Sequence, residues 1–348
     1  MKRDDIRLAL PSKGRLKDEA LGFLKACGLG VYMPNPRQYQ AIIPAVPAIK
    51  VIFQRPGDIV SGVLQGSLDF GIAGLDMVAE KQEEGNAILV LHDALGFGHC
   101  YLGLAVPEDW ESTWAMEDLA TLLPEVVDAA KGLRVATKFP YLTCKFLAES
   151  GIEHFTLIEA EGTLEVAPAI GYADIIADLV STGTTLRDNR LRPLADGVII
   201  RSQAALIANR GVLQSNETAM AVARELLEYF EAHLRARENY LVVANMRGDS
   251  PEAIAGRMFT QTTLGGLQGP TIAPVFNPNG NGERWHSISI VVHKENLTQA
   301  IADLRKIGGS GVIVSPVTYI FEEEPACYRR LVEAIKEPLI DQSGGMPA

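Results

Sequence analysis

An acidic side chain and a run of small polar residues stand together near the middle of the chain. Asp178 closes an apolar, strand-like stretch, and a bend of five small residues follows it shortly afterwards. The bend consists of Ser181, Thr182, Gly183, Thr184 and Thr185. Such a bend directs several backbone N–H groups toward one point and adds hydroxyl groups, which is the chemistry that holds a phosphate monoester. The same residues also suit a turn that only caps a helix, and their spacing matches neither the Walker A loop nor the dinucleotide fingerprint.

The acid before the bend favours the phosphate interpretation. A carboxylate three residues ahead of a phosphate cradle is placed to accept ribose hydroxyls or to hold a magnesium ion, and Mg²⁺ prefers carboxylate oxygens. Asp178 is therefore predicted as a metal and ribose ligand, and Asp174 could assist it. The alternative is that Asp178 is a strand-end acid that faces solvent.

Basic side chains recur where strands are expected to end. In open α/β sheets, ligands bind beyond the carboxyl ends of the strands. Arginine suits phosphate there because its planar guanidinium donates two hydrogen bonds to one anion. Each of these residues alone could be a solvated surface charge, so their recurrence in an acidic protein is the informative observation. They are Lys13, Arg15, Arg37, Arg55 and Lys138.

Composition excludes several classes of protein. The formal net charge of −11 argues against nonspecific binding to nucleic acid or to an anionic membrane, because a polyanion is repelled on average. The four cysteines form no CxxC pair, so neither a zinc ribbon nor a disulfide framework is indicated. No apolar run has the length of a signal peptide or a membrane span. We therefore expect a cytoplasmic protein with neither a nucleic-acid nor a membrane partner.

The elements that must position these side chains form two α/β blocks. Strands expected at 6–10, 49–55 and 68–74 alternate with helices at 18–27 and 57–67, and the pattern repeats from residue 100. The second block includes a helix expected at 162–172. Apolar strands interleaved with helices indicate mainly parallel sheets covered on both faces. A third block after residue 237 follows the order β-α-β-β-α-β, which is the ferredoxin-like arrangement. Its middle strands are joined by an expected hairpin loop, "NPNGNGERW".

Several motifs together resemble a known family. The stretches "LALPSKGRL", "FGIAGLDMV", "LRVATKFPYLT", "EGTLEVAPAIGYADIIADLVSTGTTLR" and "LIANR" are similar to those of the ATP phosphoribosyltransferases of histidine biosynthesis. The third block, with "GLQGPTIAPV" and "IGGSGVIVSPVTYIFEE", resembles the regulatory domain of the family's long form. The resemblance implies two lobes of the type II periplasmic-binding-protein kind, a ferredoxin-like regulatory domain, Mg²⁺ dependence, inhibition by histidine, and dimers that assemble into hexamers.

The resemblance also implies where the domains begin and end. The first lobe would hold residues 1–99 and 203–237, because the chain returns to it after the second lobe, which would hold 100–202. The regulatory domain would span 238–340, and 341–348 would be a tail.

The chemistry implied by the resemblance assigns roles to the candidate residues. Phosphoribosyl pyrophosphate (PRPP) would place its 5-phosphate in the bend from Ser181 to Thr185 and its pyrophosphate against Arg15 and Arg37. N1 of the adenine ring of ATP would then attack the anomeric carbon. Glu165 could support the developing positive charge, although a glutamate in the first turn of a helix is stabilised there in any case.

Two positions depart from the family's pattern for histidine binding. In long-form enzymes an acidic residue and a serine help to hold histidine, and the corresponding positions here are Met246 and Gly269. Polar residues close by could substitute, namely Asn245, Arg247 or Asp249. Alternatively, backbone groups between Leu267 and Thr271 could bind the ligand. A different class also stays open, because two-lobed α/β proteins serve as solute-binding or effector-sensing proteins that do no chemistry.

Overall fold

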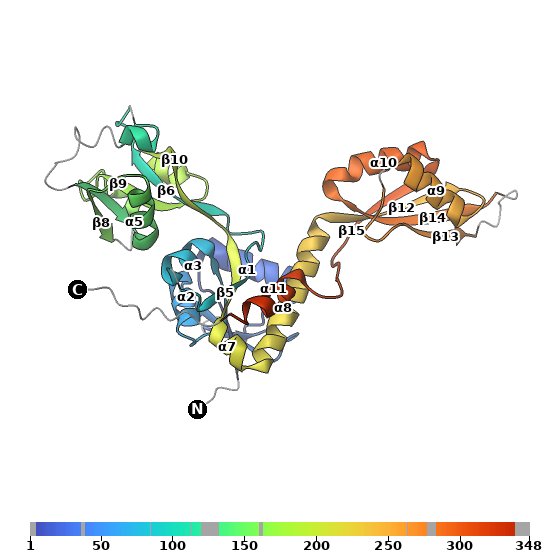
Figure 1. Cartoon of the computed structure of the whole chain (residues 1–348), viewed down its shortest axis with the longest axis horizontal. Coiled ribbons are helices and arrows are strands. Elements are labelled where there is room, and N and C mark those ends of the chain that lie inside the picture. Colours follow the sequence, from blue (N-terminus) through green and yellow to red (C-terminus); the bar gives the residue numbers. More distant parts are fainter. Residues whose placement is uncertain are drawn as a thin grey trace. The chain divides into compact units, whose positions relative to one another are not determined.

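The structure is a computed structural model. It describes the chain apart from residues 1–4, 36–38, 84, 112, 120–131, 160–162, 263, 277–282 and 338–348. Arg37, most of the expected hairpin loop and the expected tail at 341–348 lie outside the described residues. Contacts divide the chain into two compact units (Figure 1). The larger unit holds the described residues up to Leu227 and those from Ala326 onward, and the smaller unit is Glu228–Pro325.

The first lobe of the larger unit is built on a six-stranded sheet in the order β2-β3-β1-β4-β11-β5. Strands β1, β3 and β4 run parallel, as their continuous apolar sequences predict, while β11 pairs antiparallel with β4 and β5. The strands are β1 Ile6–Pro11, β2 Gln40–Ile42, β3 Ile49–Gln54, β4 Phe70–Gly74, β5 Ile88–His92 and β11 Ala204–Asn209. The helices are α1 Gly14–Ala26, α2 Pro56–Leu64, α3 Leu75–Gln82 and α7 Arg210–Ser215.

The second lobe is built on a five-stranded sheet in the order β10-β6-β9-β7-β8. Strands β7, β8 and β9 are parallel to one another, β6 runs antiparallel to its neighbour β9, and β10 runs antiparallel to β6. The strands are β6 Cys100–Pro107, β7 Leu133–Thr137, β8 Phe155–Glu159, β9 Ile175–Val180 and β10 Leu191–Ser202. The helical segments are α5 Pro140–Glu149, η1 Leu164–Val166 and α6 Thr184–Asp188.

The expected helix at 162–172 is wrong. Its described residues form only the short 3₁₀ turn η1, followed by further turns. Pro168 provides no backbone N–H for a helix, and Gly171 adopts a positive φ of 70° that ends the segment.

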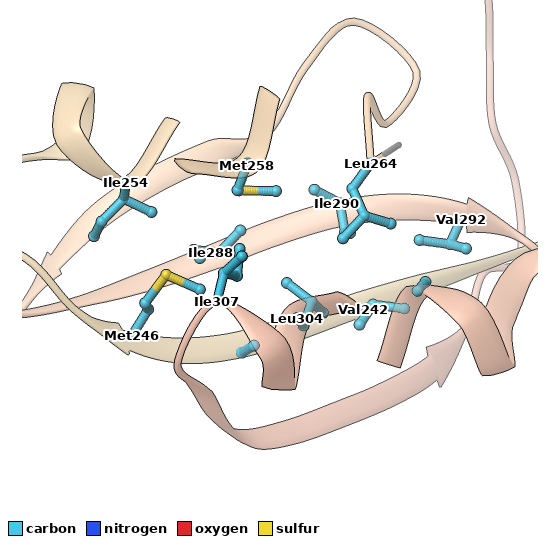
Figure 2. Packing of buried hydrophobic residues seen from close by; sticks show 12 residues of the cluster. Val242, Met246, Ile254, Met258, Leu264, Ile288, Ile290, Val292, Leu304 and Ile307 are labelled. Carbon is cyan, nitrogen blue, oxygen red and sulfur yellow. The ribbon is translucent and has the colours of Figure 1, made fainter. Parts of the chain in front are cut away.

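The smaller unit confirms the predicted ferredoxin-like order. Strands β12 Asn239–Arg247, β13 Thr271–Val275, β14 Trp285–His293 and β15 Gly309–Pro316 form an antiparallel sheet in the order β13-β14-β12-β15. Helices α9 Pro251–Gln261 and α10 Leu297–Lys306 complete the β-α-β-β-α-β arrangement. Alternate residues of β12 and β14 pack with both helices in one apolar core, which Figure 2 shows from close by.

Two further helices lie at the boundaries of the units. The long helix α8, Glu217–Arg237, begins in the larger unit, and α11, Ala326–Ala334, belongs to that unit as well. Helix α11 buries Cys327 and Leu331 and packs against β5, the edge strand of the first sheet. The expected regulatory range of 238–340 therefore needs correction at its end, because α11 buries its apolar side chains against the sheet of the first lobe.

Candidate active site

A cleft of about 1170 Å³ is lined by residues from both lobes of the larger unit. Its wall contains Asp178 and five other predicted site residues, each of which lies close to the end of a strand. Those five are Lys13, Arg15, Arg55, Lys138 and Ser181. The positions follow from the topology, because each of the five comes just after the carboxyl end of a strand, namely β1, β3, β7 or β9. Parallel neighbours in each sheet bring these ends to one edge.

Arg15 connects the two lobes inside this cleft. It lies in the first turn of α1, with a side chain that is 61% exposed. Its Nη1 donates to Ser181 Oγ over 3.0 Å, and its Nε donates to Glu19 Oε1 over 2.6 Å. The second oxygen of Glu19 accepts a hydrogen bond from Gly98 N at 3.0 Å. The guanidinium is therefore held at the entrance to the bend by a carboxylate of its own helix.

Asp178 lies on β9 with a carboxylate that is largely withdrawn from water. Burial raises its pKa above the ordinary value, although a hydrogen bond from Leu179 N at 2.8 Å and the positive charge of Lys138 act in the opposite direction. The negative charge of Glu165 adds to the increase in pKa. Glu165 itself sits in η1 and is not among the residues that line the cleft.

The bend after β9 has the backbone form that its sequence predicts. Gly183 adopts a left-handed φ of +71° and precedes α6, whose first residue is Thr184. The hydroxyls of Thr182 and Thr184 lie 3.1 Å apart and share a hydrogen bond. Ser181 belongs to the cleft wall, and the rest of the bend is exposed or half-buried in the turn that leads from this wall into α6.

Asp174 does not join Asp178, contrary to expectation. It stands just before β9, about 13 Å along the strand from Asp178 at 3.3 Å per residue. There its two oxygens bind Arg134, at 2.7 Å to Nη2 and 3.2 Å to Nε, and one oxygen also accepts Arg134 N at 2.8 Å. Asp174 therefore fixes the amino end of β9 to β7, while the bend lies at the opposite end.

Two buried acids in the cleft wall were missed by the sequence analysis. Asp76 and Glu80 lie on α3, and their side chains face the second lobe. Asp76 accepts a hydrogen bond from Ser202 Oγ, and Glu80 accepts hydrogen bonds from two backbone N–H groups of α5. Burial raises the pKa of both carboxyls. Their spacing of four residues in "GLDMVAEK", directly after a buried strand, was the available signal, since residues four apart share a helix face.

The described residues hold no preformed cage for a metal ion. No group of three or more His, Cys, Asp or Glu side chains in the described ranges has the geometry to bind one. Magnesium commonly binds through one or two carboxylates together with substrate phosphates and water. Asp178 is one of several carboxylates in the cleft wall that can meet this requirement.

The predicted regulatory residues fall on two faces of the smaller unit. Met246 is 0% exposed and packs in the apolar core beneath α9 and α10 (Figure 2), so it cannot contact a ligand on the open face of the sheet. Asn245 is exposed on that opposite face, as is Thr271 at the start of β13. Leu267 is exposed, and Gly269 has a φ of +119° that favours glycine.

Fold and cleft together define a two-lobed α/β protein of the type II periplasmic-binding-protein kind that carries a ferredoxin-like domain. The family model described as ATP phosphoribosyltransferase matches residues 55–231, and that described as the HisG C-terminal domain matches residues 236–319. The chain belongs to the ATP phosphoribosyltransferase family, in its long form.

Relatives support this assignment over most of the chain. ATP phosphoribosyltransferase 2, chloroplastic, of Arabidopsis thaliana is 47% identical over 334 residues, which are 95% of this chain and 80% of that protein. The ATP phosphoribosyltransferase of Nitrobacter hamburgensis is 31% identical over 95% of this chain and 98% of its own length. That of Mesorhizobium japonicum is 38% identical but covers only 62% of this chain, with 94% of its own length. This chain is accordingly a pentosyltransferase of the first step of histidine biosynthesis, with ATP and PRPP as substrates, in a family that generally needs a metal.

Proposed function

We propose that ATP and PRPP react in the cleft that both lobes line. The observation that carries this proposal is the meeting of Arg15 and Ser181 at 3.0 Å in the same cleft as Asp178. One cleft is therefore lined by Arg15, which can bind an anion, by Ser181 at the start of the phosphate-binding bend, and by Asp178, a carboxylate suited to ribose or metal. The non-catalytic alternative, a two-lobed solute-binding protein, is not favoured because the chain belongs to a family of enzymes.

PRPP would lie across the cleft from one lobe to the other. Its 5-phosphate would bind the N–H groups and hydroxyls of the bend from Ser181 to Thr185, and its ribose hydroxyls would donate to Asp178. Its pyrophosphate would face Arg15 and a second arginine, Arg37, which is not among the described residues. The remaining basic residues of the wall, Lys13, Arg55 and Lys138, would attract the triphosphate of ATP.

The reaction would be a direct displacement at the anomeric carbon. The bond from adenine N1 to that carbon forms as its bond to the pyrophosphate oxygen breaks, with inversion, and pyrophosphate leaves with the electron pair. Positive charge develops on the sugar and negative charge on the leaving group. The protein would therefore act mainly by aligning the two substrates and by placing arginine donors where the negative charge develops.

Asp178 and phosphate oxygens of the substrate would together hold Mg²⁺. The ion would neutralise part of the charge of the leaving pyrophosphate.

Regulation, assembly and location complete the proposal. Histidine would inhibit through the smaller unit, with Asn245 and the backbone between Leu267 and Thr271 as its polar contacts, and the protein would form dimers and hexamers. A cytoplasmic location is proposed as well, since none of its four cysteines forms a disulfide. No helix in the described part of the chain is long and apolar enough to cross a bilayer.

Measuring pyrophosphate release tests both the proposed reaction and its location in the cleft. The protein is mixed with ATP, PRPP and Mg²⁺, and the initial rate is compared between the natural chain and Asp178→Asn. The natural chain should release pyrophosphate only when both substrates are present, and the variant should be at least about tenfold slower. If the protein bound both substrates but released no pyrophosphate, it would be a binding protein and the proposed reaction would be wrong.

A further inference from the structure

Helix α5 begins without a cap of its own. Its N-cap residue is Phe139, whose phenyl ring has no hydrogen-bond acceptor, and the next residue, Pro140, has no N–H. Tyr141 and Leu142 therefore carry the first free backbone N–H groups of the helix. Such groups need a partner from outside the helix, because its own carbonyls cannot reach them.

Glu80 supplies that partner from the other lobe. Its Oε1 accepts Tyr141 N at 2.9 Å, and its Oε2 accepts Leu142 N at 3.0 Å. Glu80 lies on α3 and is only 7% exposed. A carboxylate in this position gains from two charge-assisted hydrogen bonds and from the positive end of the helix dipole. The contact therefore joins one helix of each lobe.

The capped end of α5 is part of the cleft wall. The segment 137–140, which leads into α5, lines the cleft together with Glu80. Thr137 Oγ1 accepts Phe139 N at 2.9 Å and so fixes the turn that presents Lys138. The position of Lys138 relative to the first lobe therefore depends on where Glu80 holds the start of α5.

A second acid on α3 reinforces the same connection. Asp76 lies one turn before Glu80, and Ser202, its hydrogen-bond partner, is the last residue of β10 in the second lobe. The backbone N–H of Asp76 also donates to Ser202 Oγ at 3.0 Å. Glu80 thus binds α5 of the second lobe, and Asp76 binds the end of β10, where the chain crosses back to β11 of the first lobe.

We propose that Glu80 is a positioning residue, whose carboxylate holds the start of α5, and with it Lys138, in place against the first lobe for the reaction. This inference rests on the proposed function, because it requires that the reaction occur in this cleft. Loss of this contact can have a large effect on the rate, since misplacing a substrate-contacting group by about 1 Å can lower the rate roughly a hundredfold.

Three variants test the inference. Glu80→Ala removes the cap, and Glu80→Gln keeps its size and one acceptor oxygen. Asn216→Ala is the matched control, because Asn216 Oδ1 also accepts two backbone N–H groups, Thr218 N at 3.0 Å and Ala219 N at 3.2 Å, but does so at the start of its own helix α8. The kcat, the KM for each substrate and the Tm are measured for each full-length protein.

We expect Glu80→Ala to lower kcat at least about tenfold while each KM changes less than about threefold, with Glu80→Gln in between. Asn216→Ala should lower Tm and leave kcat within about twofold of the natural chain. A kcat within about twofold for folded Glu80→Ala, while Asp178→Asn loses activity, would overturn the inference alone. If neither variant lost activity, the assignment of the cleft would fall as well. Should Glu80→Ala fail to fold, Glu80→Gln decides, and an unchanged kcat there overturns the inference.

Discussion

Arg15 Nη1, at the start of α1 in the first lobe, donates a hydrogen bond to Ser181 Oγ, at the end of β9 in the second lobe, over 3.0 Å. The two residues are 166 positions apart in the chain, yet each follows directly from the carboxyl end of a strand. A single phosphorylated ligand can therefore contact both. This relationship makes the arginine the most informative basic residue to change.

Replacing Arg15 with Ala should lower kcat by at least about tenfold, with a smaller change in KM, because the guanidinium would bind the pyrophosphate most tightly as its charge develops. Arg15→Lys should recover only part of the rate, since an ammonium group lacks the bidentate fork. Steady-state rates of pyrophosphate release at saturating ATP and PRPP provide the measurement.

Arg7→Ala is the control for Arg15→Ala. Arg7 lies near the opposite end of β1, where its Nε pairs with Asp5 Oδ2 at 3.1 Å. Its loss should leave kcat and KM within about twofold, because this half-buried charge lies away from the site. A rise in KM alone for Arg15→Ala would show that Arg15 binds substrate and transition state equally, contrary to the proposed role.

The phosphate-binding bend is tested by Thr184→Val combined with Thr185→Val. Losing two hydrogen bonds to a charged phosphate should cost about 2–4 kcal/mol, which is roughly a 30- to 1000-fold weaker affinity for PRPP. Both side chains are exposed, so the fold should be retained. Calorimetric titration with PRPP gives the dissociation constant, and an unchanged value would remove the bend from the account.

Much of this site could be predicted from the sequence because its signals are local. Arg15, Lys138 and Ser181 follow apolar runs that form buried strands, and strand ends at one edge of a sheet meet whatever their separation in the chain. The contribution of α3 was not predictable in the same way. The role of Glu80 depends on a partner 61 residues away, on a helix whose own sequence provides no cap.

Two other predictions, for Asp174 and for the end of the regulatory domain, also failed for physical reasons. The pattern of Asp174 and Asp178 is compatible with two ligands on one strand, but their spacing puts them about 13 Å apart along β9. At the start of that strand, Arg134 binds Asp174. Residues 326–334 were assigned to the regulatory range because nothing local indicates that they form a helix, α11, that packs on β5. Chain connectivity and charge pairing decide such cases, and neither is visible in a short window of sequence.

Asp178→Asn should raise the Tm of the substrate-free protein at neutral pH. Burial raises the pKa of Asp178 in the folded chain, so ionising this group costs stability once the pH exceeds the pKa in the unfolded chain. The gain in stability of Asp178→Asn over the natural chain is therefore absent at low pH, grows as pH rises through the pKa of folded Asp178, and stays constant above it. Thermal melts of both proteins across this pH range test the sign, and a lower Tm for the variant at neutral pH would contradict it.

An internal deletion should separate catalysis from regulation better than a truncation. Cutting the chain near Arg237 also removes α11 and exposes β5, so activity would fall for reasons unrelated to histidine. Replacing Glu228–Pro325 with about eight Gly and Ser residues, which span about 15 Å, keeps α11. Such a linker can close the gap because Arg224 on α8 lies over the ring of Tyr328 on α11, 5.5 Å from its centroid.

The deletion protein should retain activity and lose inhibition by histidine, while the full chain should be inhibited. Initial rates up to millimolar histidine are sufficient, since a site of about 4 kcal/mol has a dissociation constant near 1 mM. A flat response of the full chain would show that this smaller unit, with Met246 buried in its core, does not bind histidine.

PRPP is proposed to react in the cleft that contains Asp178, and the paired variants Asp178→Asn and Asp174→Asn give the sharpest test of that site. Both changes remove one carboxylate charge from β9 or its immediate start, but only Asp178 lines the cleft. The measurement is kcat/KM for PRPP at saturating ATP and Mg²⁺. The account predicts a loss of at least about tenfold for Asp178→Asn, and for Asp174→Asn a lower Tm with kcat/KM within about threefold of the natural chain. Equal losses in both variants, or an unchanged kcat/KM in Asp178→Asn, would contradict it.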